Sequence, residues 1–359
     1  MKIWLDAPDP KSVIFLNKIA EKFNQIGAKI LFTTRMHREI PRLLQLWNIK
    51  ANIVGSHGKT LKEKLIVSAE RILNLIPLVE KFSPDCAISF SSPECARVAF
   101  GLAIPHITLS DSPHAEAVSR LTVPLSRYLF SPWVIPKKAW TKYGIQKSNI
   151  YQYKGLDVVA WIKNFKPNEK VLDELGLDTN KKLVVIRALE VYAAYVMDYK
   201  KDPTVRIVRG ILHNAFENIQ IVVLPRYESQ IIEFKKEFAN LPVKVAEEPV
   251  DAQSLIYYAD LHICSGGTMA QEGALLGTPT ISSFPIRYKI YYLEYLAKKK
   301  LLFKPKDINE VITLAKRILK KSDLIKRRLK ERAKKELRKM EDPAEFTAKK
   351  VTELLFRSS

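Results

Sequence analysis

The sequence predicts an α/β protein of two doubly wound, Rossmann-like domains, each a parallel sheet covered by helices. The chain has 359 residues, which is enough for two domains of ordinary size. Residues 1–33 follow a strand–helix–strand order, and the same alternation begins again at Leu183–Ile186. Residues 259–281 then give a strand, a glycine turn, a helix and another strand. We therefore expect the two domains at residues 1–160 and 165–340.

Composition limits the class of protein further. Hydrophobic residues make up 47% of the chain, which supports two full cores. The three cysteines are widely spaced and odd in number, so they predict buried thiols in a reducing compartment rather than disulfides or a metal cluster. The N-terminus has no signal-peptide pattern, and no apolar run approaches the roughly 20 residues of a membrane span. We expect a cytoplasmic protein.

The charge balance is strongly basic. Lys and Arg number 59 against 38 Asp and Glu, which gives a net charge of +21. An excess of this size favours anionic partners, namely nucleic acid, lipid headgroups or phosphorylated substrates. Nucleic acid ranks last because no recognition motif accompanies the charge. The dense stretch Lys320–Lys339 can lie on the anionic inner face of a membrane, although a solvated helix face is the commoner explanation.

Two acidic residues and a polar loop follow strands of the first domain. Asp6 and Asp9 come after the strand Ile3–Leu5, so both are candidates for a catalytic base, while Asp9 can instead start the next helix. The loop at residues 55–59 follows the strand Ala51–Val54 and can reach a ligand, although such a loop is more often only a turn. Helices are expected on either side of this loop, near Pro41–Trp47 and over Leu61–Phe82.

The richest polar patch of the first domain follows the buried strand Pro105–Leu109. Asp111, His114 and Glu116 stand close together there, and the carboxyl ends of strands line the crevice of a doubly wound sheet. The two carboxylates are expected to raise the pKa of His114, which would make it a base toward an acceptor hydroxyl. The alternative is a histidine at a helix entry that a carboxylate merely satisfies. All three residues are candidates for catalysis.

A glycine turn in the second domain has the form of a phosphate site. Ser265, Gly266, Gly267 and Thr268 link a strand to a short helix. The glycines let the backbone approach a ligand, and the helix N-terminus attracts a phosphate. Glu272 lies about one turn inside the helix, where a carboxylate can accept hydrogen bonds from ribose hydroxyls. The alternative is a tight turn followed by a solvated glutamate.

Two arginines at other strand ends of this domain are candidates for binding phosphate. Arg187 follows Leu183–Ile186, and Arg226 follows Ile219–Leu224. The forked guanidinium group matches phosphate oxygens. A surface arginine is the alternative at position 226. The sequence has no Asp-x-Asp metal motif, so we expect no metal, with phosphate charge neutralised by helix dipoles and arginine.

The spacing Ser-Gly-x-x-x-x-x-Glu-x-x-x-x-Gly-x-Pro from Ser265 to Pro279 resembles the nucleotide-sugar signature of GT-B enzymes. The peptidoglycan lipid-linked GlcNAc transferase has the same spacing, and UDP-GlcNAc 2-epimerase has a similar segment. The chain as a whole resembles an uncharacterised, largely archaeal domain-of-unknown-function family that shares this architecture. That likeness rests on residues 4–6, 92–94, 111–117, 120–122 and 267–270.

The resemblance implies a GT-B-like fold, with the two domains facing across a cleft and a helix at residues 341–359 crossing back to the first. It also implies a metal-independent glycosyltransferase that moves a sugar from a nucleotide-sugar to an unknown acceptor, lipid-linked or phosphorylated. In such an enzyme Glu272 holds the donor ribose, and no cofactor is needed beyond the substrate. The alternatives are a sugar-nucleotide epimerase, in which Glu116 falls near a catalytic carboxylate, and a non-catalytic nucleotide-sugar-binding protein.

Overall fold

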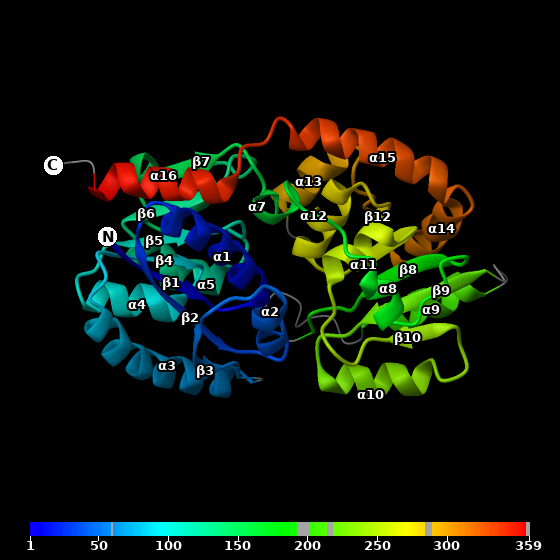
Figure 1. Ribbon diagram of the computed structural model, residues 1–359, viewed down its shortest axis with the longest axis horizontal. Helices are drawn as coiled ribbons and strands as arrows, with labels where there is room; N and C mark the ends of the chain where they lie inside the picture. Colours follow the sequence, from blue (N-terminus) through cyan, green and yellow to red (C-terminus); the bar gives the residue numbers. More distant parts are fainter. Residues whose placement is uncertain (59, 192–201, 214–217, 284–288, 357–359) are drawn as a thin grey trace. The chain divides into compact units, whose positions relative to one another are not determined.

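A computed structural model describes residues 1–58, 60–191, 202–213, 218–283 and 289–356 (Figure 1). Contacts within the chain divide it into two compact units. Unit 1 combines Met1–Lys163 with Met340–Ser359, and unit 2 spans Asn164–Lys339. Each unit is built on its own parallel sheet, and each is described by itself.

Unit 1 contains a seven-stranded parallel sheet with the order β3-β2-β1-β4-β5-β6-β7. Its strands are β1 (Lys2–Ala7), β2 (Lys29–Met36), β3 (Asn52–Ser56), β4 (Cys86–Phe90), β5 (His106–Leu109), β6 (Tyr128–Pro132) and β7 (Ile150–Tyr153). Its helices are α1 (Pro10–Gln25), α2 (Ile40–Leu46), α3 (Leu61–Phe82), α4 (Pro93–Gly101), α5 (Glu116–Thr122), α6 (Lys138–Thr141), α7 (Val159–Ile162) and α16 (Pro343–Phe356), with short 3-10 turns at Val123–Leu125 and Lys147–Asn149. Helix α16, from the C-terminal end of the chain, packs on α1 (Figure 1).

Local sequence explains where α1 begins. The Asp9 side chain accepts a hydrogen bond from the Ser12 amide at 3.0 Å, and the Ser12 side chain accepts one from the Asp9 amide at 2.9 Å. Pro10 stands in the first turn, where its missing N–H costs nothing. Asp9 is therefore the cap of this helix, which was one of its two expected roles.

Unit 2 contains a five-stranded parallel sheet with the order β10-β9-β8-β11-β12. Its strands are β8 (Lys182–Arg187), β9 (Ile219–Leu224), β10 (Val243–Val245), β11 (Leu261–Cys264) and β12 (Thr280–Ser282). Its helices are α8 (Lys170–Glu174), α9 (Thr204–Leu212), α10 (Glu228–Glu237), α11 (Ala252–Tyr258), α12 (Gly267–Leu276), α13 (Tyr291–Lys298), α14 (Ile308–Leu319) and α15 (Ser322–Leu337). The apolar faces of these strands and of α9, α10 and α14 form one core.

Helix α12 ends at a glycine that packs closely against α15. Gly277 ends α12 with φ +76°, in the left-handed region that favours glycine. A Cβ atom at this position would also lie 2.5 Å from the Lys330 backbone in α15. Residues Ala270 to Leu276 are all buried, so α12 is fixed firmly behind the turn that precedes it.

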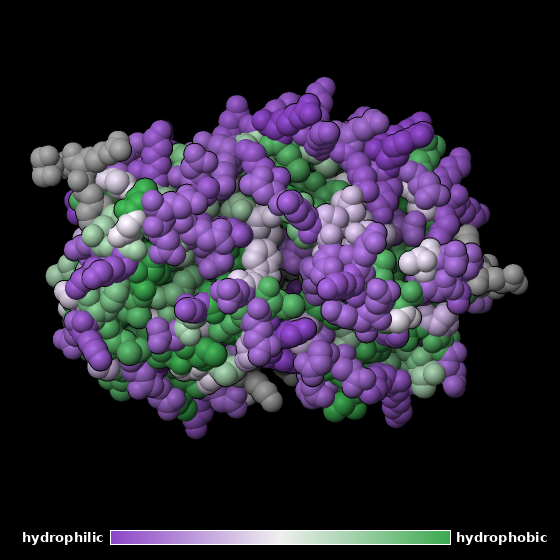
Figure 2. All heavy atoms as spheres, viewed as in Figure 1, coloured by the Kyte–Doolittle hydropathy of each residue, from purple (hydrophilic) through white to green (hydrophobic). Residues whose placement is uncertain are grey.

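Helix α15 presents a basic outer face. Its buried residues are Ser322, Leu329, Ala333 and Glu336. The exposed cations of this helix and of the two residues that follow it, which we call the α15 basic face, are Arg327, Arg328, Arg332, Lys334, Lys335, Arg338 and Lys339. Figure 2 shows hydrophilic side chains gathered over this helix. Among the described residues, no helix combines the length and the apolar character that crossing a bilayer requires.

Each sheet reverses its strand order once. The reversal lies between β1 and β4 in unit 1, and between β8 and β11 in unit 2. Ligands of doubly wound sheets bind beyond the carboxyl ends of the strands at such a point. The loops after these four strands, and after their neighbours, are therefore where a site is expected.

Candidate functional site

In unit 2, the turn after β11 is fastened to the end of β8. The Ser265 amide donates a hydrogen bond to the Arg187 carbonyl at 3.3 Å. The Ser265 hydroxyl lies 2.8 Å from the Ser283 hydroxyl, which follows β12. Both predicted residues, Arg187 and Ser265, thus stand at the reversal of strand order.

Helix α12 then begins at glycine rather than at a side-chain cap. Gly266 is the N-cap, and it provides no side-chain hydrogen bond. A Cβ atom on Gly266 would lie 2.8 Å from Nη2 of Arg226, and a Cβ atom on Gly267 would collide with the Tyr292 hydroxyl of α13. Glycine at these two positions lets the guanidinium of Arg226 and the phenol of Tyr292 reach the start of the helix. Thr268 follows, half-buried, in the first turn.

Arg226 is held in place by the loops after β8 and β9. Its Nε atom donates to the Ala188 carbonyl at 3.0 Å, and its Nη1 atom lies 3.1 Å from a carboxylate oxygen of Glu190. Arg187 lies deeper, 8% exposed, and donates from Nη1 to the Pro225 carbonyl at 3.0 Å. Arg226 is therefore the arginine that reaches the turn, and Arg187 supports the loop behind it.

Glu272 is buried rather than solvated. Its residue is 2% exposed, and its Oε1 atom accepts a hydrogen bond from Nε2 of Gln253 in α11 at 2.9 Å. Gln253 therefore orients this carboxylate from a neighbouring helix. Gln253, Glu190 and Tyr292 were not predicted as site residues, because each belongs to a different element that only the fold brings near the turn.

In unit 1, the predicted Asp111 is part of a buried charge cluster with a lysine from α1. The Lys11 Nζ atom lies 2.5 Å from Asp111 and 2.6 Å from Asp157, and Tyr153 donates its hydroxyl to Asp157. The ammonium also lies 4.3 Å from the ring centroid of Phe90. Lys11, Tyr153 and Asp157 were not among the predicted site residues.

The cluster sets the protonation of its members. Burial alone would raise the pKa of Asp111, but Lys11 outweighs burial and holds that pKa below its usual value. Burial raises the pKa of Asp157 to about 6, against the opposing charge of Lys11. Burial would lower the pKa of Lys11, and the two carboxylates instead raise it. The cluster thus keeps Lys11 charged and Asp111 ionised.

His114 and Glu116 occupy different surroundings from each other. Burial lowers the pKa of half-buried His114, and Asp111 only partly opposes this. The expectation that its neighbours raise this pKa was therefore wrong, because desolvation of the imidazolium outweighs the nearby carboxylate. Glu116 lies on the outer face of α5, with a 60% exposed side chain 2.7 Å from Nη2 of Arg120. Its charge faces solvent.

Asp6 lies at the carboxyl end of β1 and is not available as a base. Its carboxylate accepts hydrogen bonds from both terminal nitrogens of Arg71 in α3, at 2.6 and 3.1 Å. Burial would raise the pKa of Asp6, but the Arg71 pair holds it below its usual value. Arg71 also lies 3.6 Å from Glu94 in α4. This buried network joins the two strand ends at which the sheet of unit 1 reverses.

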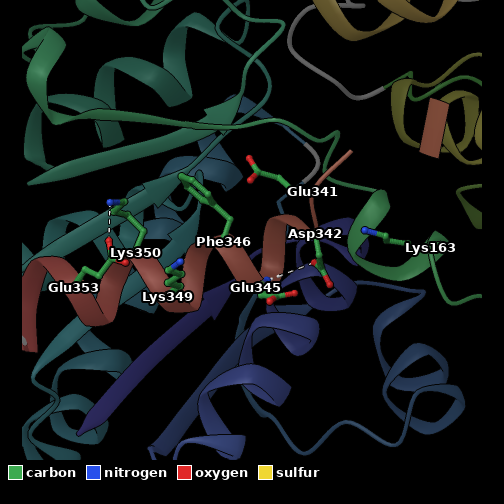
Figure 3. Close-up of a pocket in the computed structure, with 8 residues that line it drawn as sticks. All are labelled: Lys163, Glu341, Asp342, Glu345, Phe346, Lys349, Lys350 and Glu353. Atoms are coloured by element: carbon green, nitrogen blue, oxygen red, sulfur yellow. Dashed lines mark hydrogen bonds and ion pairs between the residues drawn. The ribbon is translucent and has the colours of Figure 1, made fainter. Parts of the chain in front are cut away.

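One further hollow lies along α16 and contains none of the predicted residues. It is about 510 Å³ in volume and is lined by carboxylates and lysines. Figure 3 shows these residues, which are Lys163, Glu341, Asp342, Glu345, Phe346, Lys349, Lys350 and Glu353. Within the described ranges, no group of three or more His, Cys, Asp and Glu residues is arranged to hold a metal ion.

Sequence comparisons relate the chain to proteins without an assigned activity. A family model described as "Protein of unknown function (DUF354)" matches residues 1–355. The uncharacterised protein MJ0665 of Methanocaldococcus jannaschii is 32% identical over 317 residues, which cover 87% of this chain and 90% of that protein.

Structural comparisons relate the fold of the chain to that of several solved enzymes. A UDP-GlcNAc 2-epimerase of Neisseria meningitidis bound to UDP-GlcNAc has a TM-score of 0.68 at 14% identity, covering 100% of both chains. The M. jannaschii UDP-GlcNAc 2-epimerase in complex with UDP-GlcNAc and UDP has a TM-score of 0.72 at 18% identity, covering 98% of this chain and 100% of that one. The glycotransferase of kitacinnamycin has a TM-score of 0.60 at 13% identity, covering 99% of each. These whole-chain likenesses confirm the predicted GT-B-like fold.

Proposed function

This chain belongs to the DUF354 family of proteins of unknown function, and we propose that it is a glycosyltransferase that uses a nucleotide-sugar donor. The observation that carries the proposal is the approach of Arg226 to Gly266 at the start of α12. An arginine, a glycine turn and a helix N-terminus converge there, at the reversal of strand order in unit 2. All three favour a diphosphate. They supply positive charge without requiring a metal.

The donor is proposed to bind along the turn. Amides of residues 265–268 and the guanidinium of Arg226 hold the diphosphate, while Arg187 keeps the loop after β9 in position. Glu272, oriented by Gln253, accepts hydrogen bonds from ribose hydroxyls. When the bond between the anomeric carbon and the diphosphate breaks, negative charge develops on the leaving oxygen, and these donors stabilise it.

The acceptor is proposed to be activated by unit 1. An acceptor hydroxyl attacks the anomeric carbon, a new C–O bond forms, and the hydroxyl proton passes to His114. A neutral imidazole suits this role, and burial keeps His114 neutral. Asp111, held ionised by Lys11, stabilises the imidazolium that forms. Glu116 is not assigned a step because its charge is exposed and engaged with Arg120.

Epimerisation of a sugar-nucleotide is the second candidate, favoured by the whole-chain likeness to UDP-GlcNAc 2-epimerases. It needs two acid/base groups on opposite faces of one sugar carbon. Incubation with UDP-GlcNAc alone separates the candidates, because an epimerase forms product without an acceptor. A non-catalytic binding protein would leave the donor intact even with acceptors from a lipid extract.

The test of the donor site is a thermal-shift screen with UDP-, GDP-, CDP- and dTDP-sugars. A ligand at a hundredfold excess over its Kd adds about 2.7 kcal/mol to the free energy of unfolding. We expect one donor class to stabilise the protein and Arg226→Gln to abolish that shift. Arg209→Gln, which removes an exposed arginine of the same unit, is the matched control. An unchanged shift in Arg226→Gln would contradict the site.

A further inference from the structure

We propose that unit 1 carries a second oxyanion site, formed by Arg35, His37, His57 and Lys64, that binds a phosphate or diphosphate ester. We call these four residues the Arg35 cluster. Its use for a phosphorylated acceptor rests on the glycosyl transfer proposed above, whereas the binding of the anion does not.

Neighbouring strand ends bring the cluster together. Strands β2 and β3 pair in parallel, with Met36 opposite Ser56. His37 and His57 directly follow these residues, and their ring centroids lie 6.0 Å apart, edge to face. Lys64 stands in the first turn of α3, close enough for its charge to act on His57. The cluster therefore lies beyond the carboxyl edge of the sheet, where ligands of this fold class bind.

Two closely packed glycines hold the loop that carries His57. Gly55 has φ +76°, and a Cβ atom there would lie 3.0 Å from Cγ of Arg71. A Cβ atom on Gly58 would collide with the backbone amide of Lys64. One glycine thus packs on the buried arginine and the other on the start of α3. The two contacts fix the position of His57 between them.

Arg35 supplies the central charge. Its Nε atom donates to the Pro8 carbonyl at 2.8 Å, which ties it to the loop after β1. Along the parts of the chain that the structure describes, Arg35 has no carboxylate within the 4.0 Å of an ion pair. Arg71 differs, because Asp6 and Glu94 compensate it. Arg35 is thus a guanidinium, half-buried, whose charge an anionic ligand would balance.

The electrostatics of the cluster agree with this geometry. Burial is the largest influence on the pKa of Arg35 and lowers it. The negative charges of Glu94, Asp9 and Asp6 act to raise this pKa, and the positive charge of Arg71 acts to lower it. Burial first, and then Arg35, His37 and Lys64, lower the pKa of His57 to about 4. The potential at His57 is therefore positive. A bound dianion would reverse it and raise this pKa.

Side chains, not the helix end, provide the site. The N-terminus of α3 is closed by a capping box, in which Thr60 Oγ1 accepts from the Glu63 amide at 3.1 Å and Glu63 accepts from the Thr60 amide at 3.2 Å. A phosphate at this helix end would be repelled by the Glu63 carboxylate. Guanidinium, imidazole and ammonium groups together match phosphate oxygens in charge and in donor number.

The test follows the imidazole signals of His57 by NMR in protein labelled with ¹⁵N-histidine. The chain has only 6 histidines, so the spectrum contains few signals. We expect excess inorganic pyrophosphate to raise the pKa of His57 by about 1 to 3, the range for an opposite charge at contact distance. Arg35→Gln and, independently, Lys64→Gln should weaken this response at least about tenfold. Arg42→Gln, on the exposed face of α2, is the matched control and should leave it unchanged.

Two further comparisons separate this site from the donor site. Arg226→Gln should lose the nucleotide-sugar shift and keep the His57 response. Geranyl diphosphate and glucose 1-phosphate, tested beside pyrophosphate, distinguish a lipid-linked ester from a soluble one. A His57 pKa that pyrophosphate leaves unmoved, or that moves equally in Arg35→Gln, would overturn the cluster; so would a response lost in Arg226→Gln.

Discussion

Single residues of unit 1 are arranged in charge pairs drawn from distant parts of the chain. Lys11 of α1 joins Asp111 after β5 and Asp157 after β7. Desolvation of these charges is expensive, and their mutual attraction offsets it only while every partner is present. The cluster therefore fixes the loop after β5, which also carries His114, the base proposed above.

Replacing Lys11 with Met should show that the stability of unit 1 depends on this cation. Two buried carboxylates would lose their cation, and we expect a loss of about 3–5 kcal/mol in the free energy of unfolding near pH 7. Urea unfolding measures it. Lys18→Met, which removes an exposed pair with Glu21, should cost less than about 1 kcal/mol. Equal losses in the two variants would contradict the role of Lys11.

Asp157 should give the protein a specific pH dependence. Burial raises its folded pKa to about 6, above the value of 3.8 for an unperturbed Asp. The native state then binds this proton more tightly than the unfolded chain, so the contribution favours folding at low pH and is lost as the pH rises from about 4 through 6. The pKa of Asp111 is instead lowered below 3.8, so the contribution of Asp111 to stability changes only at pH values below this window. Asp157→Asn should remove the slope between pH 4 and 6 in urea unfolding; a retained slope would contradict it.

Helices and strands were predicted well where local signals are strong. Helix α3 spans Leu61–Phe82 as expected, because Thr60 caps it and apolar residues repeat along it. The Ser265–Thr268 turn was recognised from glycine between a strand and a helix. Pairs of residues far apart in the sequence were not recognised. Arg71 bonds to Asp6 across 65 positions, and Lys11 to Asp111 across 100. Spacing along the chain carries no signal for such pairs, and only the parallel strand order brings them together.

Packing between α12 and α13 makes a further prediction at this scale. Gly267→Ala would drive a methyl group into the Tyr292 hydroxyl, which should cost about 1–3 kcal/mol and displace the turn. We expect weaker nucleotide-sugar binding by calorimetry. Tyr292→Phe removes the colliding oxygen, so the double variant should recover part of the loss. Gly101→Ala, which meets only the tip of Arg97, should be nearly neutral. Additive losses in the double variant would refute the contact.

The charge of the whole molecule, +21, is concentrated partly on the α15 basic face. Two acidic residues of that helix, Asp323 and Glu331, are also exposed, against the seven cations of this face. Each basic residue near an anionic bilayer contributes up to about 1 kcal/mol, and salt screens the attraction. A lipid-linked acceptor would place the substrate at such a surface.

We therefore expect the protein to sediment with phosphatidylglycerol vesicles at low salt, and not with phosphatidylcholine vesicles. The triple variant Lys334→Glu, Lys335→Glu, Arg338→Glu should lose about tenfold or more in affinity, because three contributions of up to about 1 kcal/mol are reversed. Lys62→Glu, Lys147→Glu, Lys181→Glu changes the net charge equally at exposed positions of other elements, and it should retain most of the binding. If both triple variants lose affinity alike, net charge and not this face drives the association. If wild-type protein binds RNA more tightly than the vesicles at the same salt, the face serves nucleic acid instead.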